Sequence, residues 1–190
     1  MVRRIWILLI LAPLIVGCSS GIERASPTRQ LVLSSSGDIV KKINLSFTPE
    51  AQKELADNLK FNQNTLVDTV RRALQARNLY DENNPHATKT VDIVMTNIRV
   101  RSNFNALMWG FMAGADKLNG DVVLRDDKGA DLNHFSVYAD YALGGLAGAQ
   151  DEARMGWLYE KFAQLTVQNL VGEVTASANG AANRSNSQRQ

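Results

Sequence analysis

The sequence predicts an α+β domain with a mostly antiparallel sheet of about four strands and two long helices on one face. Alternating or β-branched apolar residues mark strands over residues 39–47, 90–101, 120–125 and 130–141. Apolar residues at helical spacing mark helices over residues 66–79 and 151–175. The resulting order of strand, helix, three strands and helix is typical of a two-layer sandwich.

Local sequence patterns predict the first strand and the two helices that follow it. The strand over residues 39–47 stops at Thr48-Pro49, where Pro49 suits the first position of a short helix that reaches Leu59. The next helix places four apolar side chains on one face, namely Leu66, Val70, Ala73 and Leu74. A loop over residues 81–87, with Asn84-Pro85, follows it.

The second half of the domain reads as three strands and a terminal helix. In the strand over residues 90–101, the alternating apolar residues change from odd to even positions after Met95. This change indicates either a bulge or burial on both faces. The next two strands form a hairpin across residues 126–129, and the second presents one apolar face through Phe135, Val137, Ala139 and Tyr141. The inner stripe of the terminal helix is Met155, Leu158, Phe162 and Leu165.

The amino-terminal residues have the pattern of a bacterial lipoprotein signal peptide, residues 1–17. Arg3 and Arg4 precede an apolar run over residues 5–16 that is too short to span a bilayer, and Cys18 follows small residues. The expected product carries diacylglycerol and an acyl chain such as palmitate on Cys18. An uncleaved helix and an ordinary secretory signal are the alternatives. Ser19-Ser20 lacks the Asp of an inner-membrane retention signal, which favours the outer membrane, facing the periplasm.

Composition divides the rest of the chain into three parts. Residues 18–37 read as a lipidated tether rich in Ser and Arg, residues 38–175 as one domain, and residues 176–190 as a disordered tail. Loss of Arg3 and Arg4 leaves 19 basic against 19 acidic residues, so charge gives no support for nucleic-acid binding. Cys18 is the sole cysteine, which excludes a disulfide framework.

The stretch from Met108 to Val137 supports a resemblance. Its glycines and strand pattern, including Gly110, Gly114 and Gly120-Asp121-Val122-Val123-Leu124-Arg125-Asp126, are similar to a family of Gram-negative lipoproteins known only as a domain of unknown function. The order of elements also resembles the TolB amino-terminal domain and the periplasmic domain of the curli-secretion lipoprotein. The resemblance implies a fold, and it supplies no catalytic residue.

Two aromatic groups are candidates for partner binding. The segment over residues 104–118 concentrates apolar side chains, among them Trp109, Phe111 and Met112, which form either an interaction patch or part of the core. The exposed face of the terminal helix is expected to carry Arg154, Trp157, Tyr159, Glu160 and Lys161. Cover of Trp157 by the loop around Trp109 is the alternative. The predicted partner-binding residues are therefore Trp109, Phe111, Met112, Trp157 and Tyr159.

The remaining polar motifs favour structural roles. The glycine-rich residues 144–148 precede a helix whose start bears Asp151 and Glu152, which oppose anion binding. His86 and His134 have no ligand partner at helical spacing, and Asp81-Glu82 and Asp126-Asp127 fit turn formers. No catalytic residue, metal ligand or cofactor is predicted.

Together these observations predict a non-enzymatic envelope protein, held to the membrane through Cys18, that acts as a scaffold, adaptor or assembly accessory for an envelope protein partner. A small-ligand or glycan-binding lipoprotein with a pocket near residues 144–150 is the alternative. The sequence leaves homo-oligomerisation open.

Overall fold

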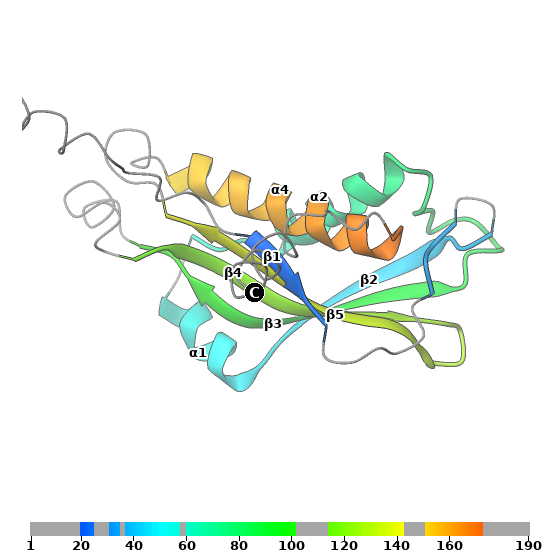
Figure 1. The fold of residues 1–190 in the computed structure, drawn as a ribbon, viewed down its shortest axis with the longest axis horizontal. Helices are drawn as coiled ribbons and strands as arrows, with labels where there is room; N and C mark the ends of the chain where they lie inside the picture. Colours follow the sequence, from blue (N-terminus) through cyan, green and yellow to red (C-terminus); the bar gives the residue numbers. More distant parts are fainter. Residues whose placement is uncertain are drawn as a thin grey trace, which may run out of the picture.

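One five-stranded sheet, in the order β1-β5-β4-β3-β2, forms the central layer of the protein (Figure 1). The computed structural model describes residues 20–24, 31–34, 37–57, 60–101, 114–142 and 151–172. The strands are β1 (Ser20–Glu23), β2 (Val40–Phe47), β3 (Lys89–Arg99), β4 (Asp116–Arg125) and β5 (Asp131–Tyr141). The helices are α1 (Pro49–Asp57), α2 (Gln63–Gln75) and α4 (Asp151–Leu170).

Strand pairing confirms the predicted α+β class with a mostly antiparallel sheet. β1 pairs with β5, β5 with β4, and β4 with β3, all antiparallel, whereas β2 pairs with β3 in parallel. The parallel pair follows from the two helices between β2 and β3, because they return the chain to the end of the sheet where β2 began. The sheet has one strand more than the four expected.

Element boundaries differ from the sequence expectation at the start of β4 and at the ends of α2 and α4. α4 ends at Leu170 rather than near residue 175. β4 begins at Asp116 rather than at residue 120, since three of its first four residues are polar and give a weak strand signal. α2 ends at Gln75 rather than near residue 79. Asn78 ends the helical region with a left-handed φ of 57°, a conformation that Asn tolerates better than most residues.

β1 lies within the range that the sequence pattern assigned to the tether. Ser20 pairs with Ala139 and Glu23 with Ser136, so these four residues extend the sheet beyond β5. Further along the same range, Leu33 is buried, and its N–H donates to the carbonyl oxygen of Leu170 at 2.7 Å. A strand this short has too few residues to show a periodic pattern.

The hydrophobic core lies between the sheet and a layer formed by α2 and α4, which pack against each other above the sheet in Figure 1. The predicted helical stripes of both helices are buried except for Ala73, which is half-buried against the core. The predicted apolar face of β5 is buried as well. The central core residues are Leu66, Val70, Leu74, Val91, Ile93, Met95, Val122, Leu124, Phe135, Val137, Leu158 and Phe162. Burial of apolar surface at roughly 25 cal/mol per Å² is the main source of stability here.

Gly120 lets α4 approach the sheet closely. A Cβ atom at this position would lie 3.3 Å from the Phe162 ring and 3.1 Å from the carbonyl oxygen of Val94. Both distances are tight, so the absence of a side chain at Gly120 makes room for the Phe162 ring over the centre of β4.

α1 lies on the opposite side of the sheet from α2 and α4 (Figure 1) and packs on β3. β3 changes register between Met95 and Asn97, so the predicted bulge is confirmed. Glu54 of α1 bonds to this bulge: its carboxylate accepts from the Ile98 N–H at 2.7 Å and from the Asn97 amide at 3.0 Å. α1 thus supplies acceptors at an irregular point of the strand ladder.

Candidate functional site

Three buried charged residues meet at the end of the sheet where β3 and β5 finish and β4 begins. We call Arg101, Asp116 and Arg154 the charged cluster. Asp116 and Arg154 are 0% exposed and Arg101 is 5% exposed. Arg101 follows β3, Asp116 is the first residue of β4, and Arg154 lies in the first turn of α4.

Asp116 is the centre of the charged cluster. Its carboxylate accepts from the Arg101 backbone N–H at 2.6 Å and from the Arg101 guanidinium at 3.3 and 3.1 Å. The Arg154 guanidinium forms a second ion pair with the same carboxylate, at 3.3 Å. Arg101 also donates to the carbonyl oxygen of Tyr141 at 3.2 Å, and Arg154 donates to that of Arg101 at 3.0 Å.

The contacts of the charged cluster join four residues that lie apart in the sequence. Arg101 and Asp116 stand on either side of residues 102–113, and Tyr141 and Arg154 stand on either side of residues 143–150. Buried ion pairs of this kind hold their elements in one arrangement, because any displacement would leave a charge in a medium of low dielectric. The cluster therefore fixes where both segments leave and rejoin the domain.

Sequence reasoning misplaced Arg154 and missed Arg101 and Asp116. The expected position of Arg154 on the exposed face of the terminal helix is wrong, because its side chain is fully buried. The spacing of these residues indicates their burial. Arg154 stands four residues before the buried Leu158, which places both on one face of α4. Asp116 is separated by even numbers of residues from the buried Leu118 and Val122, which places all three on one face of β4. Charges at inner-face positions indicate a buried pair.

An open pocket of about 500 Å³ lies between the start of α2 and the first turns of α4. Partial desolvation, followed by the charge of Arg154, lowers the pKa of Lys60 at its rim. A Cβ at Gly156, in the wall of the pocket, would meet no atom within 4 Å. The lining residues are Lys60, Asn62, Thr65, Glu152, Met155, Gly156 and Tyr159.

Trp157 and Tyr159 are positioned by ring contacts and differ in exposure. Trp157 is half-buried, and its ring meets that of Tyr141 edge-on with centroids 5.3 Å apart. Tyr159 is 4% exposed, so its expected place on the exposed face of the terminal helix is wrong. Its ring packs edge-on against Phe61, and its hydroxyl accepts from the Asn62 N–H at 2.7 Å. Burial raises the pKa of the Tyr159 hydroxyl, while the hydrogen bond from Asn62 opposes this shift. Partner binding by these two residues stays a prediction.

Several predicted features lie outside the described residues. They are the signal peptide, Cys18, the segment with Trp109, Phe111 and Met112, the glycine-rich residues 144–148 and the tail. Their roles stay predictions. Among the helices that the structure describes, none is both long and apolar enough to cross a membrane.

The carboxylates predicted to form turns do so. The Asp126 carboxylate accepts from the backbone N–H groups of Lys128 and Ala130 at 2.9 and 2.8 Å, and that of Asp81 accepts from the Asn83 N–H at 3.0 Å. Over the described ranges, no three His, Cys, Asp or Glu side chains gather as a metal site would require.

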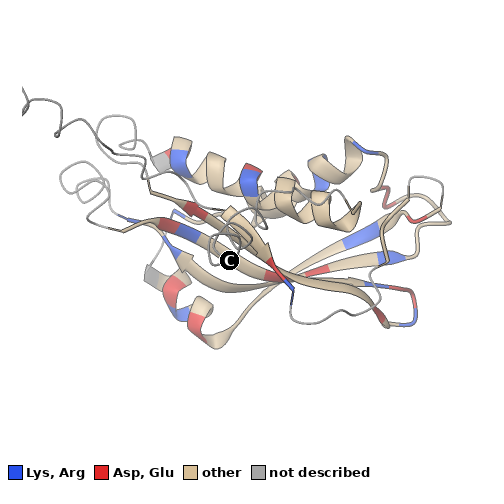
Figure 2. Ribbon diagram, viewed as in Figure 1, with Lys and Arg blue, Asp and Glu red and all other residues tan. Residues whose placement is uncertain are grey.

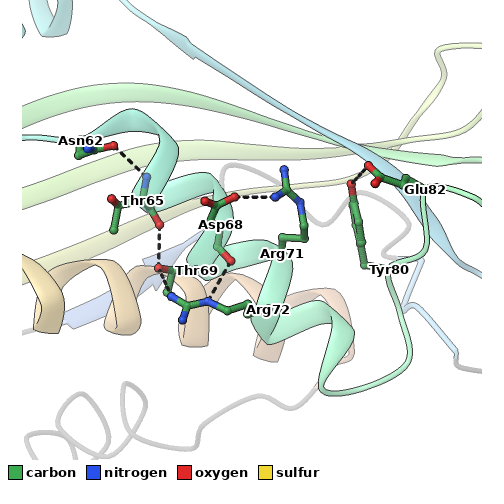
Figure 3. A network of polar contacts seen from close by, with 8 residues as sticks. All are labelled: Asn62, Thr65, Asp68, Thr69, Arg71, Arg72, Tyr80 and Glu82. Carbon is green, nitrogen blue, oxygen red and sulfur yellow. Dashed lines mark hydrogen bonds and ion pairs between the residues drawn. The ribbon is translucent and has the colours of Figure 1, made fainter.

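The solvent-facing side of α2 carries a local polar network (Figure 3). The Asn62 side chain caps the helix by accepting from the Thr65 N–H at 3.0 Å. Arg71 pairs with Asp68 at 2.5 Å, and Arg72 donates to the Thr69 hydroxyl at 3.2 Å. These contacts join neighbours one helical turn apart and stabilise the helix surface.

The fold and the charged cluster define a small α+β protein in which ionic contacts hold the residues that flank two connecting segments. The chain belongs to the family described as Domain of unknown function (DUF4410), which matches residues 28–145. This membership confirms the predicted uncharacterised domain family, and the resemblance to TolB and to the curli-secretion lipoprotein stays a prediction. No curated protein matches this sequence.

Solved structures share the general architecture at low identity. The PelC dodecamer from Paraburkholderia phytofirmans is 11% identical with a TM-score of 0.46, over 78% of this chain and 96% of that chain. A DUF330 protein from Xanthomonas campestris is 11% identical with a TM-score of 0.44, over 78% of this chain and 91% of that chain. Neither likeness carries information on partners or assembly.

Proposed function

We propose that this protein is an outer-membrane lipoprotein that faces the periplasm and acts as a non-enzymatic scaffold, adaptor or assembly accessory of the cell envelope. Cys18 supplies the lipid anchor, and the α+β domain presents a binding surface to a protein partner. The signal-peptide pattern of residues 1–18 supports the anchor.

The observation that carries the scaffold proposal is the charged cluster. Arg101 and Asp116 hold the two ends of the segment that contains Trp109, Phe111 and Met112, and Arg154 joins them to α4. A binding segment with fixed ends presents its apolar side chains from a defined place, which lowers the ordering cost of association.

The anchor is tested by fractionation. A Cys18→Ser variant is expected in the soluble periplasmic fraction, because each acyl methylene otherwise contributes about 0.8 kcal/mol of membrane binding. Wild-type protein in the same preparation is the control. Continued sedimentation of the Cys18→Ser variant with membranes contradicts the lipid anchor.

Partner binding is tested by crosslinking in intact envelopes followed by pull-down. The variant changes Trp109, Phe111 and Met112 to Ser, and the matched control changes the exposed Leu31 and Val32 to Ser. We expect the first variant, once shown to be folded, to lose a specific protein partner that the control retains. An unchanged partner set for both variants contradicts a role of the segment in binding.

The pocket beside α4 favours a second candidate function, the binding of a small molecule. Its wall includes Met155, Gly156 and Tyr159, and a Cβ at Gly156 would meet no atom within 4 Å. Lys60 and Asn62 supply polar groups at the rim. This combination suits an amphipathic ligand. Native mass spectrometry of protein purified from envelopes is expected to show a bound small molecule that a pocket-filling Gly156→Leu variant lacks; equal spectra contradict this candidate.

A further inference from the structure

The strand β1 begins only two residues after Cys18, and this spacing restricts how the domain can sit on a membrane. Consecutive Cα atoms are about 3.8 Å apart, so the Cα atoms of residues 18 and 20 are separated by at most about 7.6 Å. Ser20 is already paired in the sheet, opposite Ala139. An anchor at Cys18 therefore acts on the sheet itself through a very short link.

The register of β1 shows which end of the sheet this link approaches. From Ser20 to Glu23 the partners run from Ala139 back to Ser136, toward the β4–β5 turn. Read from Glu23 back to Ser20, β1 therefore runs toward Tyr141 at the end of β5. We call this the cluster end, because Asp116 pairs with Tyr141 there. The opposite end, with the β4–β5 turn at residues 126–130, is the far end.

We infer that the protein stands with its cluster end on the phospholipid headgroups of the bilayer and its far end directed away from them. This inference rests on the proposed lipid anchor at Cys18. It names the bilayer as the surface that the cluster end meets, so the proposed partner of the segment between Arg101 and Asp116 is met at the membrane surface. It also replaces the expected long tether between anchor and domain with a direct attachment.

The dimensions of the sheet make the orientation measurable. Lys117 lies one residue closer to the cluster end than Leu118, which shares a row of the sheet with Ala139 and Ser20. Strands rise about 3.3 Å per residue, so the eight steps from Lys117 to Arg125 span about 26 Å, and Lys128 lies beyond them in the turn. That difference is close to the thickness of the hydrocarbon layer, about 30 Å.

One aromatic contact at the cluster end agrees with this orientation. Trp157 is half-buried against Tyr141 there, and Trp and Tyr are enriched where proteins meet the membrane–water interface. The far end carries exposed carboxylates, such as Asp127, beside exposed basic side chains, such as Lys41 and Lys128, and Figure 2 shows red and blue at the right of the view. Charge therefore favours neither end, and the short link sets the orientation.

The sequence makes the test direct, because the sole cysteine is consumed by lipidation. Lys117→Cys and Lys128→Cys each introduce one free thiol and remove the same charge, so they form a matched pair. Each variant of the mature lipoprotein is labelled with a fluorophore and reconstituted into phosphatidylethanolamine–phosphatidylglycerol vesicles that contain a headgroup nitroxide lipid. Co-flotation and the intact mass establish anchoring and lipidation.

We expect the nitroxide lipid to quench the label at position 117 and to leave the label at position 128 unchanged. Equal quenching at both positions would mean that the sheet lies along the bilayer, and absent quenching in protein that floats would mean that the domain stands off the membrane. Either result overturns the inference while the proposed anchor survives. Protein that carries no lipid and does not float overturns both.

A second variant tests the short link. Twelve Gly and Ser residues inserted after Ser19 have a root-mean-square span of about 19 Å. The longer link is expected to reduce quenching at position 117 in protein that still floats. Unchanged quenching with this insertion overturns the inference that the link to β1 sets the orientation.

Discussion

Replacing Asp116 with Asn is expected to destabilise the protein more than any exposed charge change. The Asp116 carboxylate is 0% exposed and contacts both Arg101 and Arg154 at 2.6 to 3.3 Å. Asn keeps one acceptor oxygen and places an NH₂ donor against the guanidinium groups, so two buried positive charges lose their shared counter-charge. Removing one partner of a buried ion pair costs about 3–5 kcal/mol.

This loss is large beside a total stability of about 5–15 kcal/mol. A protein of this size loses about 2–4 °C in Tm per kcal/mol, so the Tm of the Asp116→Asn variant is expected to fall by about 6–20 °C. Thermal and urea unfolding, followed by circular dichroism, measure the change. Asp68→Asn is the matched control, because the Asp68–Arg71 pair lies on the surface, where such pairs contribute about 0–1 kcal/mol.

The reasoning fails if Asp116→Asn costs no more than Asp68→Asn. Arg154→Met gives a further check of the charge argument. It leaves one guanidinium, that of Arg101, against one carboxylate and fills the space with apolar atoms. We therefore expect Arg154→Met to cost less free energy of unfolding than Asp116→Asn, and the reverse order would show that packing, rather than charge balance, dominates the cluster.

Three further variants test the packing and the buried hydroxyl. Gly120→Ala is expected to destabilise by about 1–3 kcal/mol, since its Cβ would press on Phe162 and on the Val94 carbonyl oxygen. Gly156→Ala is expected to stabilise by about 0.5–1 kcal/mol, because its Cβ meets nothing and Ala favours the helix; urea unfolding measures both, and equal signs contradict the packing described. Tyr159→Phe is expected to cost about 1–3 kcal/mol through the unpaired Asn62 N–H. The folded-state pKa of Tyr159 lies above the unfolded value of about 10, so the contribution of this residue is complete below pH 10 and is lost as the pH rises through the folded value. The free energy of unfolding of wild type should thus fall more steeply than that of Tyr159→Phe above pH 10, and parallel pH profiles would contradict the assignment.

The elements with strong periodic patterns could be predicted from sequence. The stripe Leu66, Val70 and Leu74 on α2 and the apolar face of β5 are buried as expected, because helix and strand periods are local properties of the chain. The bulge after Met95 was visible for the same reason, since a change of parity must appear where a strand gains a residue.

Short or polar elements could not be predicted from the sequence. β1 has four residues and exists because β5 offers an edge with matching register, which no local pattern reveals. The parallel pairing of β2 with β3 likewise depends on where α1 and α2 return the chain. Strand order and direction are long-range outcomes of packing, so element order alone leaves them undecided.

Local patterns in the sequence suffice to predict the α+β class, the helical stripes, the hairpin turn and a lipoprotein signal that ends before Cys18. The folded structure is needed to find that Arg154 is buried, that it meets Asp116 and Arg101, and that β1 begins two residues after Cys18. The physical reason is the range of the interactions: periodicity and turn chemistry act between near neighbours, whereas the partner of a buried charge and the neighbour of an edge strand come from distant parts of the chain, which only folding brings together.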